Sequence, residues 1–423
     1  MRCVRYRFSD RDRMILVFVG VVFVVLNAMK VYVYMRFFRH SVLLPKWAGI
    51  GILVALALGE IALLVLKDVH FSHFQYLMIS SCLVLTLTLF MACVAVDTLR
   101  FGVNLSLKFS SKIQHRESKQ TSPLATQRDS KHNDINTSRR TFLSKCKDYA
   151  VAGLFLLFTF KGFSAALTLP PIKEVRIKIP HLKAKKSIAM ISDVHIGKNL
   201  GRAFLEGIVE KINALEADIV VIVGDLADDK IENIKDDLEP LKSLKSKEGV
   251  YYVCGNHEHY HGLDSILEYL RTLNLTILHN TNIELDGFNL AGVSDLAGVR
   301  FKNLEPNLES AKKGLNPQKP SILLSHQPKF VYENDVSDFD LVLCGHTHAG
   351  QVFPLSLFVW LDQHYVYGLY DITHKNMESK RLTQDSMRAD SGKTQLYVSS
   401  GVGFWGPAIR FLAPSEIVLF RLE

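Results

Sequence analysis

Long apolar segments dominate the first 170 residues of the chain. Four of them are long enough for an α-helix to cross a bilayer, which takes about 20 residues. They cover roughly residues 14–35, 47–66, 76–99 and 149–169. We expect residues 1–100 to form a three-helix transmembrane region and residues 149–170 to form a fourth hydrophobic segment. The alternative for each segment is a helix buried in a protein core. This alternative is stronger for the fourth segment than for the first three.

Few charges interrupt these segments: Lys30, Glu60, Asp97 and Lys161. Charged side chains inside a membrane can mark a transport path. These four are scattered and mostly stand near segment ends, where a long side chain can reach the interface. The pattern therefore does not favour a transporter.

A polar, basic stretch, residues 101–148, separates the third and fourth segments, and its composition is typical of a flexible linker. It ends in TSRRTFLSK, residues 137–145, in which Arg139-Arg140 precede Phe142-Leu143 and an apolar run. This order resembles a twin-arginine export signal. The motif is internal, however, and its lysine comes one place late. The basic flank of an ordinary membrane helix is the alternative.

From residue 171 onward, short apolar runs alternate with helical stretches. Helices are predicted over 202–216 and 262–273, among others. Near-continuous apolar strands indicate sheets that are covered on both faces, so we expect residues 171–423 to form a layered α/β domain. Eight runs have the length and composition of buried strands: 187–192, 218–223, 250–254, 288–293, 321–325, 341–344, 396–400 and 416–420.

The net charge of +8 is unevenly distributed. Residues 1–170 hold 22 Lys and Arg against 9 Asp and Glu, a balance of +13, which leaves 28 against 33, or −5, for residues 171–423. A nucleic-acid partner is not expected, because such a protein carries its basic excess on the folded domain. With four spans, one side of the membrane collects 15 Lys and Arg and the other 6. The positive-inside rule then predicts a protein of the inner (cell) membrane with residues 171–423 on the extracytoplasmic side, although the basic N-terminal tail argues against this orientation.

Potential metal ligands follow five of the predicted strands. They are Asp193 and His195, Asp225, Asn256, His326, and His346 with His348. In open α/β sheets the carboxyl ends of strands are where sites are built, and imidazole and carboxylate groups suit Mn, Fe, Zn or Co. Each motif alone is compatible with an ordinary turn or a core histidine. Together and in this order they predict a metal site. None of the six cysteines forms a Cys-x-x-Cys pair, so a zinc ribbon is not indicated, and Cys254 and Cys344 are expected to be buried.

The series Asp-x-His, Gly-Asp, Gly-Asn-His-Glu, His and Gly-His-Thr-His resembles the motif set of calcineurin-like metallophosphoesterases. Residues 187–423 cover that domain nearly end to end. The stretches GHTHAGQ and SSGVGFWGPAIRFLAPSEIVLF look more specifically like membrane-linked bacterial phosphohydrolases of this superfamily, some of which carry twin-arginine-like segments. The resemblance implies N-terminal transmembrane helices followed by a four-layer α/β sandwich.

The resemblance also implies two divalent ions per chain, of Mn, Fe or Zn. One ion would be held by Asp193, His195, Asp225 and His348, and the other by Asp225, Asn256, His326 and His346, with Asp225 bridging. Two cations about 3.5–4 Å apart clamp phosphoryl oxygens and activate a shared water as hydroxide. His257 would lie beside the ions without ligating them, with a pKa near neutrality, and would either stabilise the phosphorane-like charge or protonate the leaving oxygen as the catalytic residue.

For other polar residues near these motifs the sequence supports only weaker predictions. Arg410 could contact the substrate phosphate, and a structural ion pair is the alternative. His259 and His261 are expected to be solvated loop residues. Residues 371–394 are expected to form a mobile surface loop.

The function implied is a membrane-anchored phosphohydrolase that cleaves a phosphodiester or pyrophosphate bond. Related enzymes cleave UDP-diacylglucosamine in lipid A synthesis, and the anchor makes a lipid-linked substrate reasonable. A nuclease or cyclic-nucleotide phosphodiesterase on the same scaffold is the first alternative. A membrane sensor with a metal-binding domain is an alternative of another class.

Overall fold

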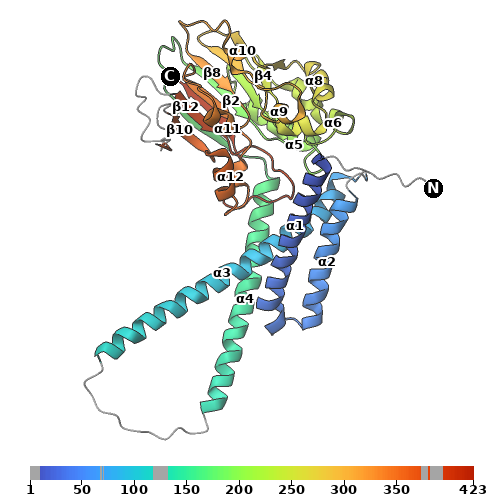
Figure 1. The fold of residues 1–423 in the computed structure, drawn as a ribbon, viewed down its shortest axis with the longest axis vertical. Helices are drawn as coiled ribbons and strands as arrows, with labels where there is room; N and C mark the ends of the chain where they lie inside the picture. The colour runs from blue at the N-terminus through green and yellow to red at the C-terminus, as the bar shows by residue number, and fades with distance from the viewer. Residues whose placement is uncertain (1–9, 67–68, 70, 118–131, 373–379, 382–393) are drawn as a thin grey trace, which may run out of the picture. The chain divides into compact units, whose positions relative to one another are not determined.

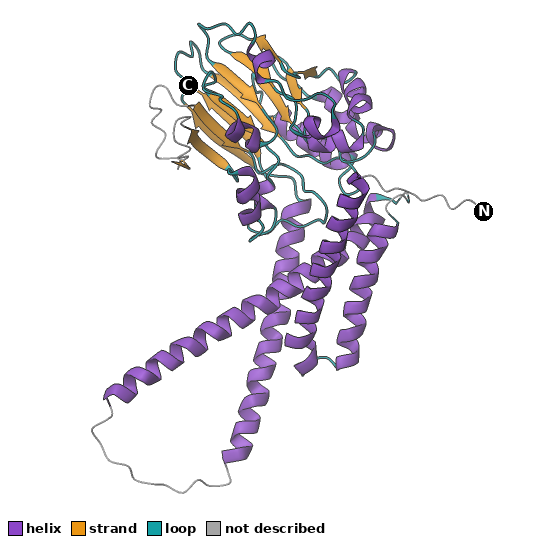
Figure 2. Ribbon diagram, viewed as in Figure 1, coloured by secondary structure: helices purple, strands orange, loops and turns teal. Residues whose placement is uncertain are grey.

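The computed structural model describes residues 10–66, 69, 71–117, 132–372, 380–381 and 394–423. The chain divides into two compact units. The first unit comprises Met1–Val69 and Met78–Phe160, and the second comprises His70–Leu77 and Lys161–Glu423. Figure 1 traces the chain, and Figure 2 separates the long helices from the sheets.

Four helices of the described chain are long and apolar enough to cross a membrane. They are α1 (Asp10–Arg36), followed by the short turn η1 (Phe38–His40), α2 (Lys46–Val65), α3 (His73–Glu117) and α4 (His132–Leu167). Only 17–44% of each apolar window is buried, which leaves most of these side chains free to face lipid. Length and composition thus confirm the four predicted apolar segments.

Helix α3 extends to Glu117 and α4 begins at His132, so most of the polar stretch 101–148 is helical. This differs from the flexible linker expected from composition. Leu, Lys, Arg and Gln are good helix formers, and a helix that is already nucleated in an apolar segment extends at little cost. Arg139 and Arg140 fall within α4, and the contacts of their side chains lie outside the description.

The second unit contains two mixed sheets. The first sheet has the order β1 (Ile172–Ile177), β13 (Ile417–Leu422), β2 (Lys186–Ile191), β3 (Ile219–Val223), β4 (Val250–Val253) and β5 (Thr276–Ile277). The second has the order β11 (Lys380–Arg381), β10 (Gly368–Ile372), β12 (Thr394–Val398), β9 (Leu341–Cys344), β8 (Ser321–Leu324), β7 (Asn289–Gly292) and β6 (Thr281–Glu284). Strands β2, β3 and β4 run parallel in one sheet, as do β7, β8 and β9 in the other.

The two sheets pack face to face with helices on their outer faces (Figure 2). Alternate residues divide each strand between two cores: Ile188 and Met190 of β2 point between the sheets, whereas Ala189 and Ile191 pack against the outer helices. The remaining helical elements are α5 (Arg202–Asn213), α6 (Ile231–Leu238), η2 (Glu239–Ser243), α7 (Asn256–His261), α8 (Leu263–Arg271), α9 (Ala297–Phe301), α10 (Leu308–Lys312), α11 (Pro328–Glu333), η3 (His348–Gly350) and α12 (Ser356–Gln363). This is the layered α/β architecture that the strand pattern predicts.

All eight predicted strands are present, and the two predicted helices are α5 and α8. The pattern does not reveal β1, β5, β6, β10 and β11, which are short, polar or at sheet edges, where alternation of apolar residues is weak. The expected surface loop 371–394 lies mostly outside the described residues.

Candidate metal centre

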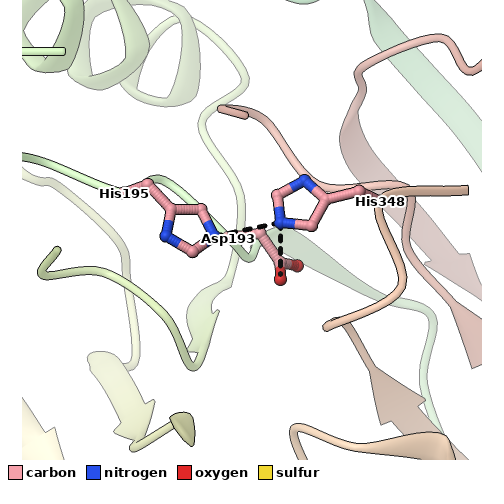
Figure 3. A group of neighbouring side chains, drawn as sticks. All are labelled: Asp193, His195 and His348. Atoms are coloured by element: carbon pink, nitrogen blue, oxygen red, sulfur yellow. Dashed lines mark hydrogen bonds and ion pairs between the residues drawn. The ribbon is translucent and has the colours of Figure 1, made fainter. Parts of the chain in front are cut away.

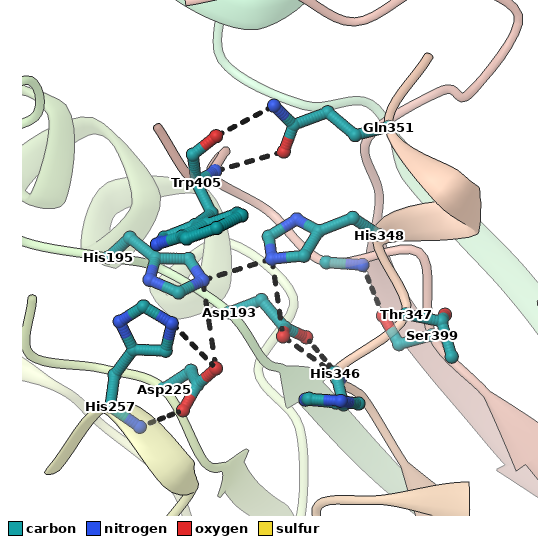
Figure 4. A network of polar contacts seen from close by, with 12 residues as sticks. Asp193, His195, Asp225, His257, His346, Thr347, His348, Gln351, Ser399 and Trp405 are labelled. Atoms are coloured by element: carbon teal, nitrogen blue, oxygen red, sulfur yellow. Dashed lines mark hydrogen bonds and ion pairs between the residues drawn. The ribbon is translucent and has the colours of Figure 1, made fainter. Parts of the chain in front are cut away.

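The loops that leave β2, β3, β4, β8 and β9 bring the predicted ligands together (Figure 4). Because these strands end at one edge of the two sheets, residues more than 150 positions apart in the chain become neighbours. The loops carry Asp193 and His195 after β2, Asp225 after β3, Asn256 and His257 after β4, His326 after β8, and His346 and His348 after β9.

One cluster consists of Asp193, His195 and His348 (Figure 3). The two Nε2 atoms of His195 and His348 lie 2.9 Å apart, and His348 Nε2 is 3.5 Å from Asp193 Oδ1. Two ligands of one ion at about 2.0–2.2 Å are separated by about 3–4 Å. The three side chains therefore have the spacing of ligands to a shared cation.

A second cluster consists of Asp225, His326 and His346. His326 Nε2 lies 3.1 Å from Asp225 Oδ2, and His326 Nδ1 is 2.9 Å from the Val223 carbonyl oxygen. A contact of this kind fixes the ring and leaves Nε2 available for a metal.

Two further potential ligand atoms, Asn256 Oδ1 and His346 Nδ1, are buried without a hydrogen-bond partner in the described part of the chain. A buried polar atom without a partner costs free energy, so native proteins rarely retain one without a reason. The residues present thus fit a divalent cation with oxygen and imidazole ligands.

Asp225 lies between the two clusters. Its Oδ2 is 3.1 Å from His326 Nε2 and 3.8 Å from His195 Nε2, and these two rings belong to different clusters. The position suits a carboxylate that bridges two ions.

Five of these residues adopt the left-handed backbone conformation, although none is glycine. The φ angles are +56° at Asp193, +54° at His195, +52° at Asp225, +71° at His346 and +49° at His348. This conformation costs of order 1–2 kcal/mol per residue and persists only where the surroundings enforce it. The fold thus imposes the ligand geometry on its loops at a cost in stability.

Two glycines make room at the centre. A Cβ on Gly224, whose φ is +75°, would lie 2.3 Å from His326 Nδ1, and a Cβ on Gly255 would lie 2.2 Å from Asp225 Oδ1. The Gly-Asp and Gly-Asn pairs in the sequence therefore have a steric cause, because any side chain there would displace a candidate ligand.

Glu258 holds the loop that carries Asp225. Its buried carboxylate accepts hydrogen bonds from the backbone N–H groups of Asp225, Leu226, Ala227 and Gly255, at 2.7–3.1 Å. The sequence analysis named this glutamate only as part of the Gly-Asn-His-Glu motif. Its place, three residues after Gly255 at the start of α7, is the signal that could have identified its capping role.

Burial sets the protonation tendencies of the first cluster. Desolvation raises the pKa of Asp193 to about 6 and lowers the pKa of His195 to about 4. Histidine must be neutral to ligate a metal, so the low pKa of His195 keeps a lone pair available at neutral pH. A bound cation would lower the pKa of Asp193 again and so favour its ionised form further.

His257 makes an ion pair that the sequence analysis did not anticipate. Its Nδ1 lies 2.5 Å from Asp228 Oδ1, and its Nε2 lies 4.0 Å from Asp225 Oδ2. Although burial lowers the pKa of His257, the charge of Asp225 and the hydrogen bond to Asp228 outweigh it and raise the pKa to about 9. This is above the near-neutral value expected. The signal that could have revealed Asp228 is its place three residues after the Gly-Asp motif.

Arg410 is buried behind the candidate ligand His348. Its side chain is 1% exposed, and its guanidinium donates to four backbone carbonyls, those of Ser400, Gly403, Ala413 and Pro414. Its Nη2 also lies 3.0 Å from His348 Nδ1. Arg410 thus supports the loop and a candidate ligand from behind, which is nearer to the structural alternative.

The histidines after the Gly-Asn-His-Glu motif are not solvated as expected. His259 is buried and its ring lies 5.9 Å from that of Phe301. His261 Nε2 lies 3.4 Å from Asp228 Oδ1. Helix α7 directs His259 toward the interior and leaves His261 partly exposed, whereas the sequence pattern suggested a loop. Cys254 and Cys344 are buried as expected.

Comparison with known proteins points to one family. The family model described as calcineurin-like phosphoesterase matches residues 186–350. The chain is 37% identical over 383 residues to an uncharacterised metallophosphoesterase of Helicobacter pylori, covering 90% of each chain. It is 33% identical over 270 residues to a transmembrane protein with a metallophosphoesterase domain from Danio rerio, covering 60% of this chain and 58% of the other.

A third relative is named for an enzymatic activity. The chain is 27% identical over 297 residues to the UDP-2,3-diacylglucosamine pyrophosphatase LpxG of Chlamydia muridarum, covering 58% of this chain and 85% of that protein.

Proposed function

The chain belongs to the metallophosphoesterase family and is a hydrolase of phosphoric ester bonds, and from this premise we propose that it is a membrane-anchored, two-metal enzyme that cleaves a phosphodiester or pyrophosphate bond. The observation that carries the proposal is the pair of ligand clusters around Asp225. Each cluster offers one carboxylate and two imidazoles, and Asp225 lies within 4 Å of rings from both. A single structural ion would not need the second cluster.

The candidate ligands divide between two ions. Asp193, His195 and His348 would hold one, and Asn256, His326 and His346 the other, with Asp225 shared. When bound, two such ions neutralise phosphoryl oxygens and provide an activated water for in-line attack. The chain's own contribution is to fix the ligands by the strained loops and by Glu258.

His257 supplies the proton in this proposal. Its Nδ1 is occupied by Asp228, so the proton available to a substrate is the one on Nε2, which points toward Asp225 and the clusters. A pKa raised to about 9 keeps that proton in place at neutral pH, where it can pass to the leaving oxygen. Bound cations would lower this pKa toward neutrality and make the proton easier to donate.

The substrate proposed is lipid-linked. The support is the four membrane helices in the same chain and the similarity to LpxG, a pyrophosphatase whose named substrate carries two acyl groups. If the second unit lies outside the cytoplasm, a cell-envelope phosphodiester is favoured over a nucleotide-linked precursor.

Extracytoplasmic placement of the second unit is proposed from the distribution of Lys and Arg. Cys146, which is exposed near the start of the fourth span, offers a test. In intact cells a membrane-impermeant thiol reagent should leave Cys146 unmodified but should modify a cysteine introduced at exposed Gln318. The reverse labelling would place the second unit in the cytoplasm.

Hydrolysis of bis(p-nitrophenyl) phosphate by the purified full-length protein tests the activity. Activity should disappear with EDTA and return with Mn, Fe or Zn. Failure with all three metals, in protein that binds them, would favour the sensor alternative. Cleavage of single-stranded DNA at a rate matching the diester would favour the nuclease, which the balance of −5 over residues 171–423 makes less suitable.

A further inference from the structure

Helix α12 exposes its apolar face instead of burying it. The α12 surface, comprising Phe353, Leu355, Leu357, Phe358, Trp360 and Leu361, consists of large apolar side chains that are 46–68% exposed. Surface helices of soluble domains normally bury their apolar stripe. An apolar cluster of this size on a folded domain is typical of an interaction site.

The C-terminal residue of the same helix, Gln363, faces the domain. Gln363 is 3% exposed, and its Oε1 accepts a hydrogen bond from the Lys329 backbone N–H at 3.1 Å. Asp362 pairs with the Lys329 side chain at 3.2 Å. These contacts hold the C-terminal end of α12 on the domain while its apolar side chains remain exposed. The exposure therefore does not come from a helix that has detached from the domain.

The neighbouring loop 405–412 continues the apolar surface. Its Leu412 is 72% exposed and its Trp405 51% exposed. The backbone N–H of Phe353 donates to the Phe411 carbonyl at 3.0 Å, which ties the start of the α12 surface to this loop.

The same loop packs against the end of a candidate membrane span. The Arg410 backbone N–H donates to the Gly162 carbonyl at 3.0 Å, and a Cβ on Gly162 would lie 2.8 Å from Ile409. Gly162 belongs to the fourth candidate span, Thr141–Leu167, and also to the second compact unit. Within that unit, the loop beside α12 thus touches a helix near the C-terminal end of the fourth candidate span.

We infer that the α12 surface inserts into the interface of the lipid bilayer that the chain itself spans. An outward apolar face with aromatic residues is what an interfacial helix requires, and Trp360 suits the headgroup region. The fourth candidate span runs into the same compact unit, so a bilayer around it would be available to cover this exposed apolar area.

Contacts of Gln351 and Trp405 connect the α12 surface to the metal centre. Gln351 follows His348 by three residues, and its side-chain amide holds the Trp405 backbone, donating to the carbonyl at 2.7 Å and accepting from the N–H at 3.0 Å. The Trp405 ring lies edge-on to that of His257, with ring centres 5.9 Å apart. Docking would therefore present the centre to phosphoesters at the membrane surface. This consequence, unlike the docking itself, rests on the proposed function.

Fluorescence quenching tests the docking directly. The chain has three tryptophans, so a W47F/W405F variant leaves Trp360 as the sole reporter in full-length protein reconstituted into vesicles. Lipids brominated along the acyl chains should quench Trp360 strongly relative to unbrominated lipids. In the control, a W47F/W360F/W405F variant carries Gln318→Trp on the loop before β8, at the opposite sheet edge from the metal motifs, and should show no quenching.

Absence of Trp360 quenching would overturn the inference. If Trp360 is then shielded from aqueous iodide, a second copy or another segment of this chain covers the helix. If iodide quenches it fully, the α12 surface faces water.

A substrate comparison tests the consequence for catalysis. The F358S/L361S variant changes exposed residues only. It should hydrolyse bis(p-nitrophenyl) phosphate like the wild type but act about tenfold less efficiently on vesicle-bound p-nitrophenyl hexadecyl phosphate, because two anchoring side chains are lost. Equal loss on both substrates would contradict a docking role. Inactivity of the wild-type protein on both would count against the proposed function and leave the quenching result standing.

Discussion

Asp228 Oδ1 lies 2.5 Å from His257 Nδ1 and orients the imidazole so that its Nε2 points toward Asp225. His261 also lies beside Asp228, with Nε2 3.4 Å from Oδ1. Although burial raises the pKa of Asp228, the hydrogen bonds from these two rings outweigh it and lower the pKa well below its usual value. The carboxylate therefore stays ionised and favours the protonated form of His257.

Asp228→Asn should shift the pH–rate profile. If His257 acts as the acid, activity is present below its pKa and is lost as pH rises through it. Without the Asp228 charge that pKa falls, so the alkaline limb should move to lower pH by about one unit or more. Profiles of kcat for wild type and variant test this, with exposed Asp236→Asn as the matched control. An unchanged alkaline limb in Asp228→Asn, with lower activity at every pH, would show a purely structural role.

The strands and the ligand-bearing loops of the second unit could be predicted because each loop directly follows an apolar run. Sequence position marks Asp228 and Glu258 only as candidates. Their contacts, and the burial of His259, could not be predicted, because they depend on how α7 turns back over the loop of Asp225. The contacts of Arg410 could not be predicted from the sequence either. Its contacts come from the turns of its own loop and from His348, 62 positions away, and the sequence offers no periodic signal for either.

His257→Ala should separate chemistry from metal binding. The ring is beside both clusters, yet its Nδ1 is occupied by Asp228. We expect near-normal metal content but a fall in kcat of about 10²- to 10⁴-fold on bis(p-nitrophenyl) phosphate. Metal analysis of the purified protein and steady-state kinetics measure the two quantities. Wild-type turnover in this variant would remove His257 from the mechanism.

Asp225→Asn should disturb both ions at once. An amide oxygen carries no full charge, so it cannot serve two cations as a bridging carboxylate does. We expect both the metal stoichiometry and the activity to fall to a small fraction of wild type, whereas Asp264→Asn, on the exposed side of α8, should change neither. Full metal content with a normal rate would show that Asp225 does not bridge.

Glu258→Gln should destabilise the second unit. The amide nitrogen of glutamine cannot accept a hydrogen bond, so some of the four backbone N–H groups now held by the carboxylate would lose their acceptor in a buried site. Leaving such a donor unpaired costs about 1–3 kcal/mol. Thermal unfolding of metal-free protein should show the loss, and exposed Glu268→Gln is the control. An unchanged transition temperature would mean that the loop of Asp225 is held by other contacts.

In the membrane helices, charges that look scattered in the sequence meet in the fold. Lys30 of α1 forms a buried ion pair with Glu60 of α2, and Thr86 of α3 donates to Glu60 Oε1 at 2.6 Å. Spacing along the chain cannot show this, because the pairing depends on the rotation of three separate helices. The cluster joins the three helices through side chains that are costly to bury singly.

Replacing one residue of the Lys30–Glu60 pair should lower the free energy of unfolding more than replacing both. Lys30→Met leaves Glu60 without its charged partner, and Glu60→Met does the same to Lys30, so each single variant should lose about 3–5 kcal/mol. The double variant replaces both charges by apolar side chains of similar volume and should recover most of that stability. Unfolding of full-length protein in detergent, followed by circular dichroism, measures the cycle, with exposed Lys161→Met as the control. If the double variant is as unstable as the single ones, the two residues do not act as a pair. If it is stable but no longer hydrolyses bis(p-nitrophenyl) phosphate, the cluster has a role beyond holding the helices together.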